Sequence, residues 1–324
     1  MPRRVMASAR NVAMVLDQFR SELEAADVEV FFPKSAAPTL TEQELLDQLP
    51  GCLAAVAMPD AYTAQVIDAC APTLKLIARS GVGYDSIDVQ AAKRNGVWVT
   101  TTVGSNHDTV ADYTLALILH LARHIMQIAA DTRSGKWGRM AGFDLRGKTL
   151  AIIGTGRIGR EVAARAQPFG MRLLAYDLYP NQEWASSAGV TYLPLDQVLA
   201  EADVVTLHAP STPETQHLLN RETLAGCKRG VYVVNTARGE LIDEQALLEA
   251  LDSGQVAGAA LDVFASEPPT DAQRPLIAHP NVIPTSHCAG ATVEAQRRGA
   301  EIALQEVLRV ARGEKPRFPV AELT

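Results

Sequence analysis

A buried-strand sequence that runs directly into a glycine-rich turn is the feature that most constrains the fold of this chain. Residues Thr149–Ile153 are apolar or β-branched, and Gly154-Thr-Gly156-Arg-Ile-Gly159 follows at once, before a helical pattern begins. Gly154 allows the tight turn from strand to helix, Gly156 lets a phosphate group approach the backbone, and Gly159 lets the helix pack closely on the sheet. The segment therefore predicts a parallel α/β domain whose helix N-terminus faces an anion.

The rest of the chain alternates short apolar segments with longer amphipathic ones, which is typical of parallel sheets covered by helices. We expect strands at Val12–Leu16, Val28–Phe32, Leu53–Ala57, Leu74–Ala78, Thr149–Ile153, Arg172–Tyr176, Val204–His208, Val231–Asn235, Ala257–Asp262 and Val282–Pro284. One long helix over Asn106–Arg133 separates the two sets of strands, and a final helix covers Thr292–Arg312. The pattern predicts α/β architecture with two Rossmann-like, doubly wound parallel-sheet domains.

Composition argues against several classes of function. The chain has 324 residues, 47% of them hydrophobic, and a net charge of −7, whereas nucleic acids and anionic membranes attract clustered Lys and Arg. No segment approaches the roughly 18–20 apolar residues that span a bilayer, and no apolar signal segment follows the N-terminal arginines. The four cysteines form no CxxC pair and the seven histidines do not group. We therefore expect a cytoplasmic protein with no nucleic-acid partner, no membrane and no metal.

The residue that ends the second strand of the glycine-turn domain predicts the cofactor. Asp177 follows Arg172–Tyr176 and lies 18 residues after Gly159. A carboxylate at this place accepts hydrogen bonds from the adenosine ribose hydroxyls of a dinucleotide and repels a 2′-phosphate. Leu178 and Tyr179 supply no arginine for such a phosphate, so the sequence favours NAD over NADP.

Three polar side chains follow later strands and could carry chemistry. Arg238 can hold a carboxylate and a carbonyl, His287 can transfer a proton near neutral pH, and Glu267 can orient that histidine. Each residue also has a simpler interpretation, as a surface ion pair, a helix cap and a polar loop residue respectively. Together they favour hydride transfer to a 2-oxo acid, because all three end strands on the cofactor side of one sheet.

These motifs resemble the D-isomer-specific 2-hydroxyacid dehydrogenase family, which includes phosphoglycerate dehydrogenases, glyoxylate and hydroxypyruvate reductases, D-lactate dehydrogenases and formate dehydrogenase. The resemblance rests on the following segments: Ser80–Asp88, Gly154–Gly159 with Asp177, Leu207–Pro210, Asn235–Gly239, Asp262–Pro268 and His287–Thr292. It implies that residues 1–106 and 294–324 form a split substrate domain, that residues 107–293 form an inserted NAD-binding domain, and that the active site lies between them.

The resemblance also implies residue roles. It makes Arg238 the substrate-binding arginine, Glu267 the carboxylate partner of the histidine, and His287 the acid/base. It places Val82 and Gly83 at the substrate carboxylate. The implied cofactor-binding residues are Gly154, Gly156, Arg157, Ile158, Gly159, Asp177, His208, Ala209, Pro210, Thr236, Ala237, Asp262 and Gly290. A homodimer through the NAD-binding domain is implied as well.

Two departures and two alternatives stay open. Ser286 replaces the proline that more often precedes the histidine, and His107 is an unusual polar residue at the expected hinge. An NAD-sensing corepressor would keep the same three polar residues, and a donor such as formate or phosphite would keep the fold, although Glu267 argues against formate. We expect a small unphosphorylated oxo acid such as glyoxylate or hydroxypyruvate as substrate, since no Lys and Arg cluster is evident in the N-terminal loops.

Overall fold

The computed structural model describes residues 2–35, 37 and 39–322, which form two compact units. Unit 1 comprises residues 1–106 and 291–324, and unit 2 comprises residues 107–290. Unit 2 is therefore inserted into the sequence of unit 1. Each unit has one sheet with helices on both faces, and the named strands pair in parallel throughout, which confirms the predicted fold class.

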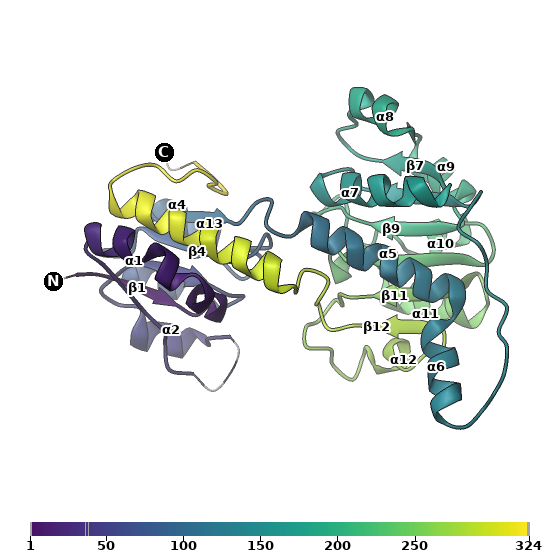
Figure 1. The fold of residues 1–324 in the computed structure, drawn as a ribbon, viewed down its shortest axis with the longest axis horizontal. Helices are drawn as coiled ribbons and strands as arrows, with labels where there is room; N and C mark the ends of the chain where they lie inside the picture. Colours follow the sequence, from purple (N-terminus) through teal and green to yellow (C-terminus); the bar gives the residue numbers. More distant parts are fainter. Residues whose placement is uncertain (1, 36, 38, 323–324) are drawn as a thin grey trace. The chain divides into compact units, whose positions relative to one another are not determined.

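Unit 1 has a five-stranded sheet in the order β2-β1-β3-β4-β5. Its strands are β1 (Arg3–Ala7), β2 (Val28–Phe31), β3 (Cys52–Ala57), β4 (Leu76–Arg79) and β5 (Trp98–Thr101). One face packs against α1 (Leu16–Ala25) and α13 (Val293–Ala311), which lie side by side in Figure 1. The other face packs against α2 (Glu42–Gln48), α3 (Ala64–Cys70) and α4 (Val89–Arg94). The last long helix of the chain thus completes the core of the first unit.

The strand predicted at Val12–Leu16 is wrong. The first strand is β1, and residues Arg10–Met14 form a 3₁₀ helix (η1) that leads into α1. Apolar residues at 12, 15, 19 and 23 are buried, and their spacing of three to four is helical. β1 begins with two exposed arginines and only its last three residues are apolar and buried, so its sequence did not indicate a strand.

Unit 2 has a seven-stranded sheet in the order β12-β11-β10-β9-β6-β7-β8. Its strands are β6 (Thr149–Ile153), β7 (Arg172–Tyr176), β8 (Val190–Tyr192), β9 (Val204–Leu207), β10 (Val231–Asn235), β11 (Val256–Leu261) and β12 (Val282–Pro284). The strand order reverses between β6 and β9. In open α/β sheets, ligands bind beyond the carboxyl ends of the strands at such a switch point.

Helices cover both faces of this sheet. On one face lie α5 (His107–Arg123), α7 (Arg157–Ala166), which is followed by η2 (Gln167–Phe169), and α8 (Gln182–Ala188). On the other face lie α9 (Leu195–Glu201), α10 (Arg221–Ala225), η3 (Gly239–Leu241), α11 (Glu244–Asp252) and α12 (Arg274–Ile277). Figure 1 shows α5 and α7 running side by side. Among the described residues, no helix has the length and apolar character needed to cross a membrane.

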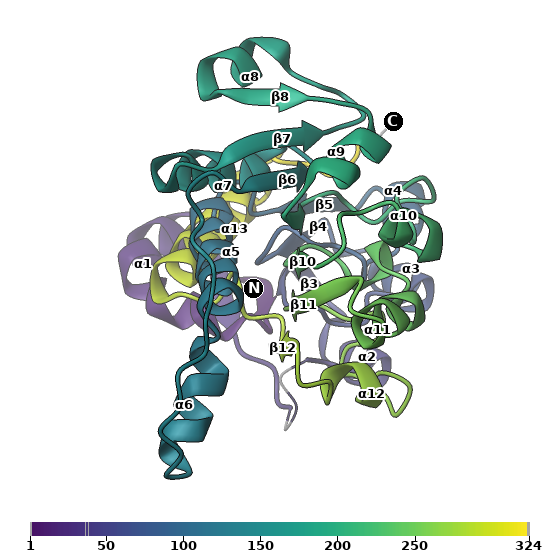
Figure 2. The same ribbon diagram turned by 90° about the vertical axis from the view of Figure 1, so that its right-hand side faces the viewer.

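The long helix predicted over Asn106–Arg133 is interrupted. His124 adopts a left-handed conformation with φ of 52° and separates α5 from α6 (Ile125–Arg133). The apolar face of α5 is buried on the sheet, whereas α6 buries no residue. Figure 2 shows α6 and the segment after it projecting from the sheet of their own unit. Apolar positions continue at helical spacing through His124, so periodicity alone did not predict the left-handed residue that ends α5.

Candidate active site

The glycine turn after β6 has the geometry that a bound phosphate requires. A Cβ atom on Gly159 would lie 2.1 Å from the carbonyl oxygen of Gly154, so the third glycine is needed for the close packing of helix and strand. Gly154 has φ of 95°, which favours glycine. At Gly156, by contrast, a Cβ atom would meet no other atom of the described chain within 4 Å. The backbone is therefore accessible there, beside the start of α7.

The first turn of α7 is free to bind an anion. Gly156 is its N-cap and has no side chain to accept from the first amides, and Arg157 is exposed. The amides of Arg157 and Ile158 and the positive end of the helix dipole therefore face the open side of the turn.

Asp177 lies beside the glycine turn, where the sequence predicted it. One of its carboxylate oxygens accepts from the Thr155 amide at 2.6 Å and from the Thr155 hydroxyl at 2.8 Å, and the other accepts from the Tyr179 amide at 2.9 Å. The Tyr192 hydroxyl lies 2.6 Å from the Thr155 hydroxyl. Thr155 and Tyr192 were not predicted as site residues, although Thr155 lies inside the glycine motif. They hold the carboxylate in a fixed orientation at the end of β7.

His287 and Glu267 form a direct pair. Nδ1 of His287 lies 2.6 Å from Oε2 of Glu267, while the other carboxylate oxygen accepts from the Phe264 amide at 3.2 Å. Glu267 follows β11 and His287 follows β12, and these strands are neighbours in the sheet. The structure thus brings together two residues that are 20 positions apart, with Nε2 of the imidazole remaining for a ligand.

The pair stabilises the charged form of both members. The hydrogen bond to Glu267 raises the pKa of His287 above its usual value, against burial and the positive charge of Arg238, which act to lower it. Burial acts to raise the pKa of Glu267, but the hydrogen bond and the charge of His287 outweigh it, so this pKa is lowered. The protonated form of His287 is therefore favoured up to a higher pH than in a histidine without such a partner.

Arg238 lies within electrostatic reach of this pair. It follows β10, and its guanidinium donates to the Ala237 carbonyl at 2.7 Å. The Asn235 side chain donates to the Arg238 carbonyl at 2.8 Å and so fixes the turn. The positive charge of Arg238 contributes to lowering the pKa of both His287 and Glu267. The three predicted catalytic residues are therefore close together in unit 2.

The carboxylate of Asp262 holds the turn that carries His287. It is buried, and it accepts from the Thr285 hydroxyl at 2.6 Å, the Cys288 amide at 3.0 Å and the Ala289 amide at 2.8 Å. The His287 amide donates to the Asp262 carbonyl at 2.7 Å. These bonds keep His287 at φ of 52°, a conformation that few non-glycine residues adopt. The place of Asp262 beside the nicotinamide stays a prediction, and the structure adds that its carboxylate holds the turn that carries His287.

The remaining predicted cofactor residues lie in turns at the same edge of the sheet. The His208 ring follows β9, has Nε2 2.9 Å from the Thr206 hydroxyl, and is neutral because burial lowers its pKa to about 3. Thr236 is buried and has its hydroxyl 3.0 Å from that of Thr114 on α5. The others in these turns are Ala209, Pro210, Ala237 and Gly290.

Val82 and Gly83 belong to unit 1. They lie in the turn after β4, which is held by the Ser80 amide donating to the Ala57 carbonyl at 2.9 Å and the Thr102 amide donating to the Gly81 carbonyl at 3.0 Å. Val82 is 37% exposed, and within the described chain the amides of Val82 and Gly83 donate to no protein acceptor. Two amides are therefore available to an external acceptor.

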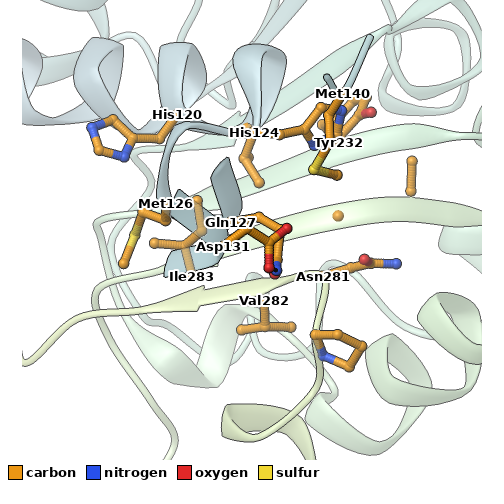
Figure 3. A pocket seen from close by; sticks show the side chains of 14 residues that line it. His120, His124, Met126, Gln127, Asp131, Met140, Tyr232, Asn281, Val282 and Ile283 are labelled. Carbon is orange, nitrogen blue, oxygen red and sulfur yellow. Dashed lines mark hydrogen bonds between the residues drawn. The ribbon is translucent and has the colours of Figure 1, made fainter. Parts of the chain in front are cut away.

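A separate cavity of about 460 Å³ lies at the opposite edge of the unit 2 sheet. It is lined by the starts of β10, β11 and β12 and by the junction of α5 and α6. Figure 3 shows Gln127 and Asp131 from α6 near Asn281 of the segment before β12. This cavity is distinct from the His287 turn.

Among the described residues, no group of three or more His, Cys, Asp or Glu side chains could hold a metal.

Unit 2 has the features of a dinucleotide-binding domain. They are the order of its strands, the glycine turn, and the first amides of α7, which have no side-chain cap. The sequence profile described as "D-isomer specific 2-hydroxyacid dehydrogenase, NAD binding domain" matches residues 115–289. This chain belongs to the D-isomer-specific 2-hydroxyacid dehydrogenase family, as its sequence motifs predicted. The match confirms NAD as the predicted cofactor.

Relatives of the chain carry several names within this family. D-3-phosphoglycerate dehydrogenase from Rattus norvegicus is 48% identical over 272 residues, which are 83% of this chain and 50% of the relative. Glyoxylate reductase from Korarchaeum cryptofilum is 40% identical over 292 residues, covering 87% of this chain and 86% of the relative. The structure of D-lactate dehydrogenase from Aquifex aeolicus, complexed with NAD and lactic acid, superposes with a TM-score of 0.83 at 29% identity and covers 96% of each chain. This chain spans about half the length of the phosphoglycerate dehydrogenases that it matches.

Proposed function

We propose that this chain is an NAD-dependent oxidoreductase that transfers a hydride between the nicotinamide and C2 of a small D-2-hydroxy acid or 2-oxo acid. The observation that carries the proposal is the 2.6 Å pair between His287 and Glu267, with Arg238 in electrostatic reach, in the sheet that also carries the glycine turn. Family membership and the names of the relatives support the same reaction.

Bound NAD would donate or accept the hydride. Residues of the chain transfer the proton, orient the histidine and bind the substrate. Because Nδ1 of His287 faces Glu267, the proton passes between Nε2 and the substrate oxygen. Glu267 favours the protonated imidazole and fixes its orientation. Arg238 binds the substrate carboxylate and carbonyl through its planar guanidinium.

The cofactor residues follow from the geometry of the turns. The amides of Arg157 and Ile158 would bind the pyrophosphate over Gly156, and Asp177 would accept from the adenosine ribose. The turns after β9 and β10, with His208 and Thr236, would line the nicotinamide side.

The substrate is proposed to be a small, unphosphorylated oxo acid such as glyoxylate or hydroxypyruvate. The amides of Val82 and Gly83, which have no protein acceptor in the described chain, would bind its carboxylate. A phosphate group on the substrate would call for a basic pocket.

The direct test is NADH oxidation, followed by absorbance, with a panel of 2-oxo acids that includes glyoxylate, hydroxypyruvate, pyruvate and phosphohydroxypyruvate. We expect turnover with a small unphosphorylated acid, a strong preference for NADH over NADPH, and loss of turnover in His287→Ala. A His287→Ala variant that retains near wild-type turnover would disprove the assigned chemistry. Binding of NADH without turnover of any acid would instead favour an NAD-sensing protein.

We also propose a homodimer formed through unit 2. Helix α6 buries no residue, and the segment from α6 to residue 143 exposes large apolar side chains beside the 460 Å³ cavity. They are Ile125, Met126, Trp137 and Met140, and Trp137 is 93% exposed. An apolar segment of this kind is typical of an interface between chains. The cytoplasmic location expected from the sequence remains a prediction.

A further inference from the structure

A chain of polar contacts joins α5 to the turn that carries His287. The Tyr113 hydroxyl on α5 lies 3.1 Å from Sγ of Cys288, and Sγ lies 3.5 Å from Oδ1 of Asp262. Tyr113 and Cys288 belong to no catalytic or cofactor motif of the sequence, although Cys288 directly follows His287. All four residues belong to unit 2.

The direction of these contacts follows from the donors available. The Asp262 carboxylate is an acceptor and already receives one hydroxyl and two amide hydrogens. The Cys288 thiol therefore donates its hydrogen to Asp262, so that the Tyr113 hydroxyl donates to the sulfur. Burial and then the contact with Cys288 raise the pKa of Tyr113 to about 12, against a hydrogen-bond interaction with Thr285 that acts to lower it, so the Tyr113 hydroxyl stays a donor at neutral pH.

The same helix contacts a second turn of the site. Thr114, next to Tyr113, has its hydroxyl 3.0 Å from that of Thr236, two residues before Arg238. Helix α5 is buried against the sheet along one face. It therefore gives the turns that carry Arg238 and His287 a common rigid support.

We propose that Tyr113 and Cys288 are positioning residues, which hold His287 in its left-handed conformation and in register with Glu267 by acting through Asp262. The inference rests on the proposed function for its effect on turnover, but the placement of His287 can be measured without a substrate. The charged groups that act directly on the imidazole are Glu267, Arg238 and Asp262, whereas Tyr113 and Cys288 are neutral and reach it only through the Asp262 carboxylate.

The experiment compares Tyr113→Phe, Cys288→Ala, Cys288→Ser and the Tyr113→Phe/Cys288→Ala double variant in the full chain. The His287 pKa is measured by NMR titration, with His287→Ala to assign the signal, and the kinetics of oxo acid reduction are recorded in parallel. Cys227→Ala is the matched control, because Cys227 is a buried thiol that donates to the Thr223 carbonyl on another helix.

Tyr113→Phe and Cys288→Ala should each lower the His287 pKa and reduce kcat by between about tenfold and a hundredfold, the range that small misplacements of a reacting group produce. KM for NADH should change little. Cys288→Ser should restore most of both values, because a hydroxyl keeps one donor and one acceptor. The double variant should resemble Cys288→Ala alone, since Tyr113 acts through the thiol.

The inference is overturned if the His287 pKa is unchanged in Tyr113→Phe and Cys288→Ala, or if the two effects add independently. If the pKa falls as expected but the wild-type chain reduces no oxo acid, the proposed function fails and the positioning role stands. Thermal unfolding of each variant, compared with Cys227→Ala, separates a loss of fold from a loss of placement.

Discussion

At the residue scale, the chemistry depends on where His287 gains and loses its proton. Its pKa is raised by the hydrogen bond to Glu267. Reduction of an oxo acid needs the protonated imidazole, so its rate should fall as the pH rises through this raised pKa. Oxidation of the hydroxy acid needs the neutral imidazole, so its rate should rise over the same interval.

Glu267→Gln should move this interval to lower pH. The neutral amide removes the charge that favours the imidazolium, while Arg238 continues to lower the His287 pKa. Profiles of kcat/KM against pH for oxo acid reduction will measure the shift, with Glu244→Gln, on a carboxylate that binds the Ala265 amide, as a control. An unchanged profile in Glu267→Gln would contradict the role assigned to the pair.

Asp177 should decide between the two nicotinamide cofactors. Asp177→Ser removes the carboxylate that is held by Thr155, so the affinity for NADH should fall by about tenfold, or about 1.4 kcal/mol. The variant should also lose its discrimination against NADPH. Titration of NADH and NADPH fluorescence measures both effects, and equal binding of the two by the wild-type chain would refute the assignment.

At the element scale, two glycines in the turn between β6 and α7 have different roles. Gly159 contributes to stability, and Gly156 contributes to cofactor binding. Gly159→Ala places a Cβ against the Gly154 carbonyl, so α7 must move off β6. Such overpacking costs about 1–3 kcal/mol, and the melting temperature should fall by several degrees. Gly156→Ala meets open space and a backbone with φ of −65°, so it should leave the melting temperature unchanged.

The informative readout is the binding of NADH by these two variants. Gly156→Ala should weaken NADH binding without loss of stability, because the methyl group occupies the open side of the turn that the pyrophosphate would approach. Full NADH affinity in Gly156→Ala would show that the phosphates do not approach this glycine.

At the scale of the whole molecule, the exposed apolar segment after α5 predicts self-association. Trp137→Ser, combined with Met126→Ser, should convert a particle of two 34.8 kDa chains into one of a single chain, because both side chains are exposed in unit 2. Light scattering after size exclusion measures the mass. Tyr179→Ser, at a side chain that is 88% exposed outside this segment, is the matched control. A wild-type chain that elutes with the mass of a monomer would exclude the dimer.

The sequence determined the features that depend on local spacing and residue chemistry. Thr149–Gly159, Asp177 and the three polar residues after later strands predicted the α/β class, the cofactor and the catalytic candidates, because periodicity and glycine geometry act over a few residues. The sequence did not predict η1 in place of a strand or the break at His124. A short apolar run is ambiguous without its packing partners, and helical periodicity does not reveal the left-handed backbone conformation of the single residue His124.

Only the tertiary structure decided which of these side chains contact one another. It placed His287 2.6 Å from Glu267, assigned the Asp262 carboxylate to the His287 turn, and brought Tyr113 to Cys288 across 175 positions of sequence. These contacts are set by the order of β9 to β12 in the sheet and by the helix that covers them. Hydrogen bonds depend on distances of a few ångströms, and the sequence specifies these only through the packing of the whole domain.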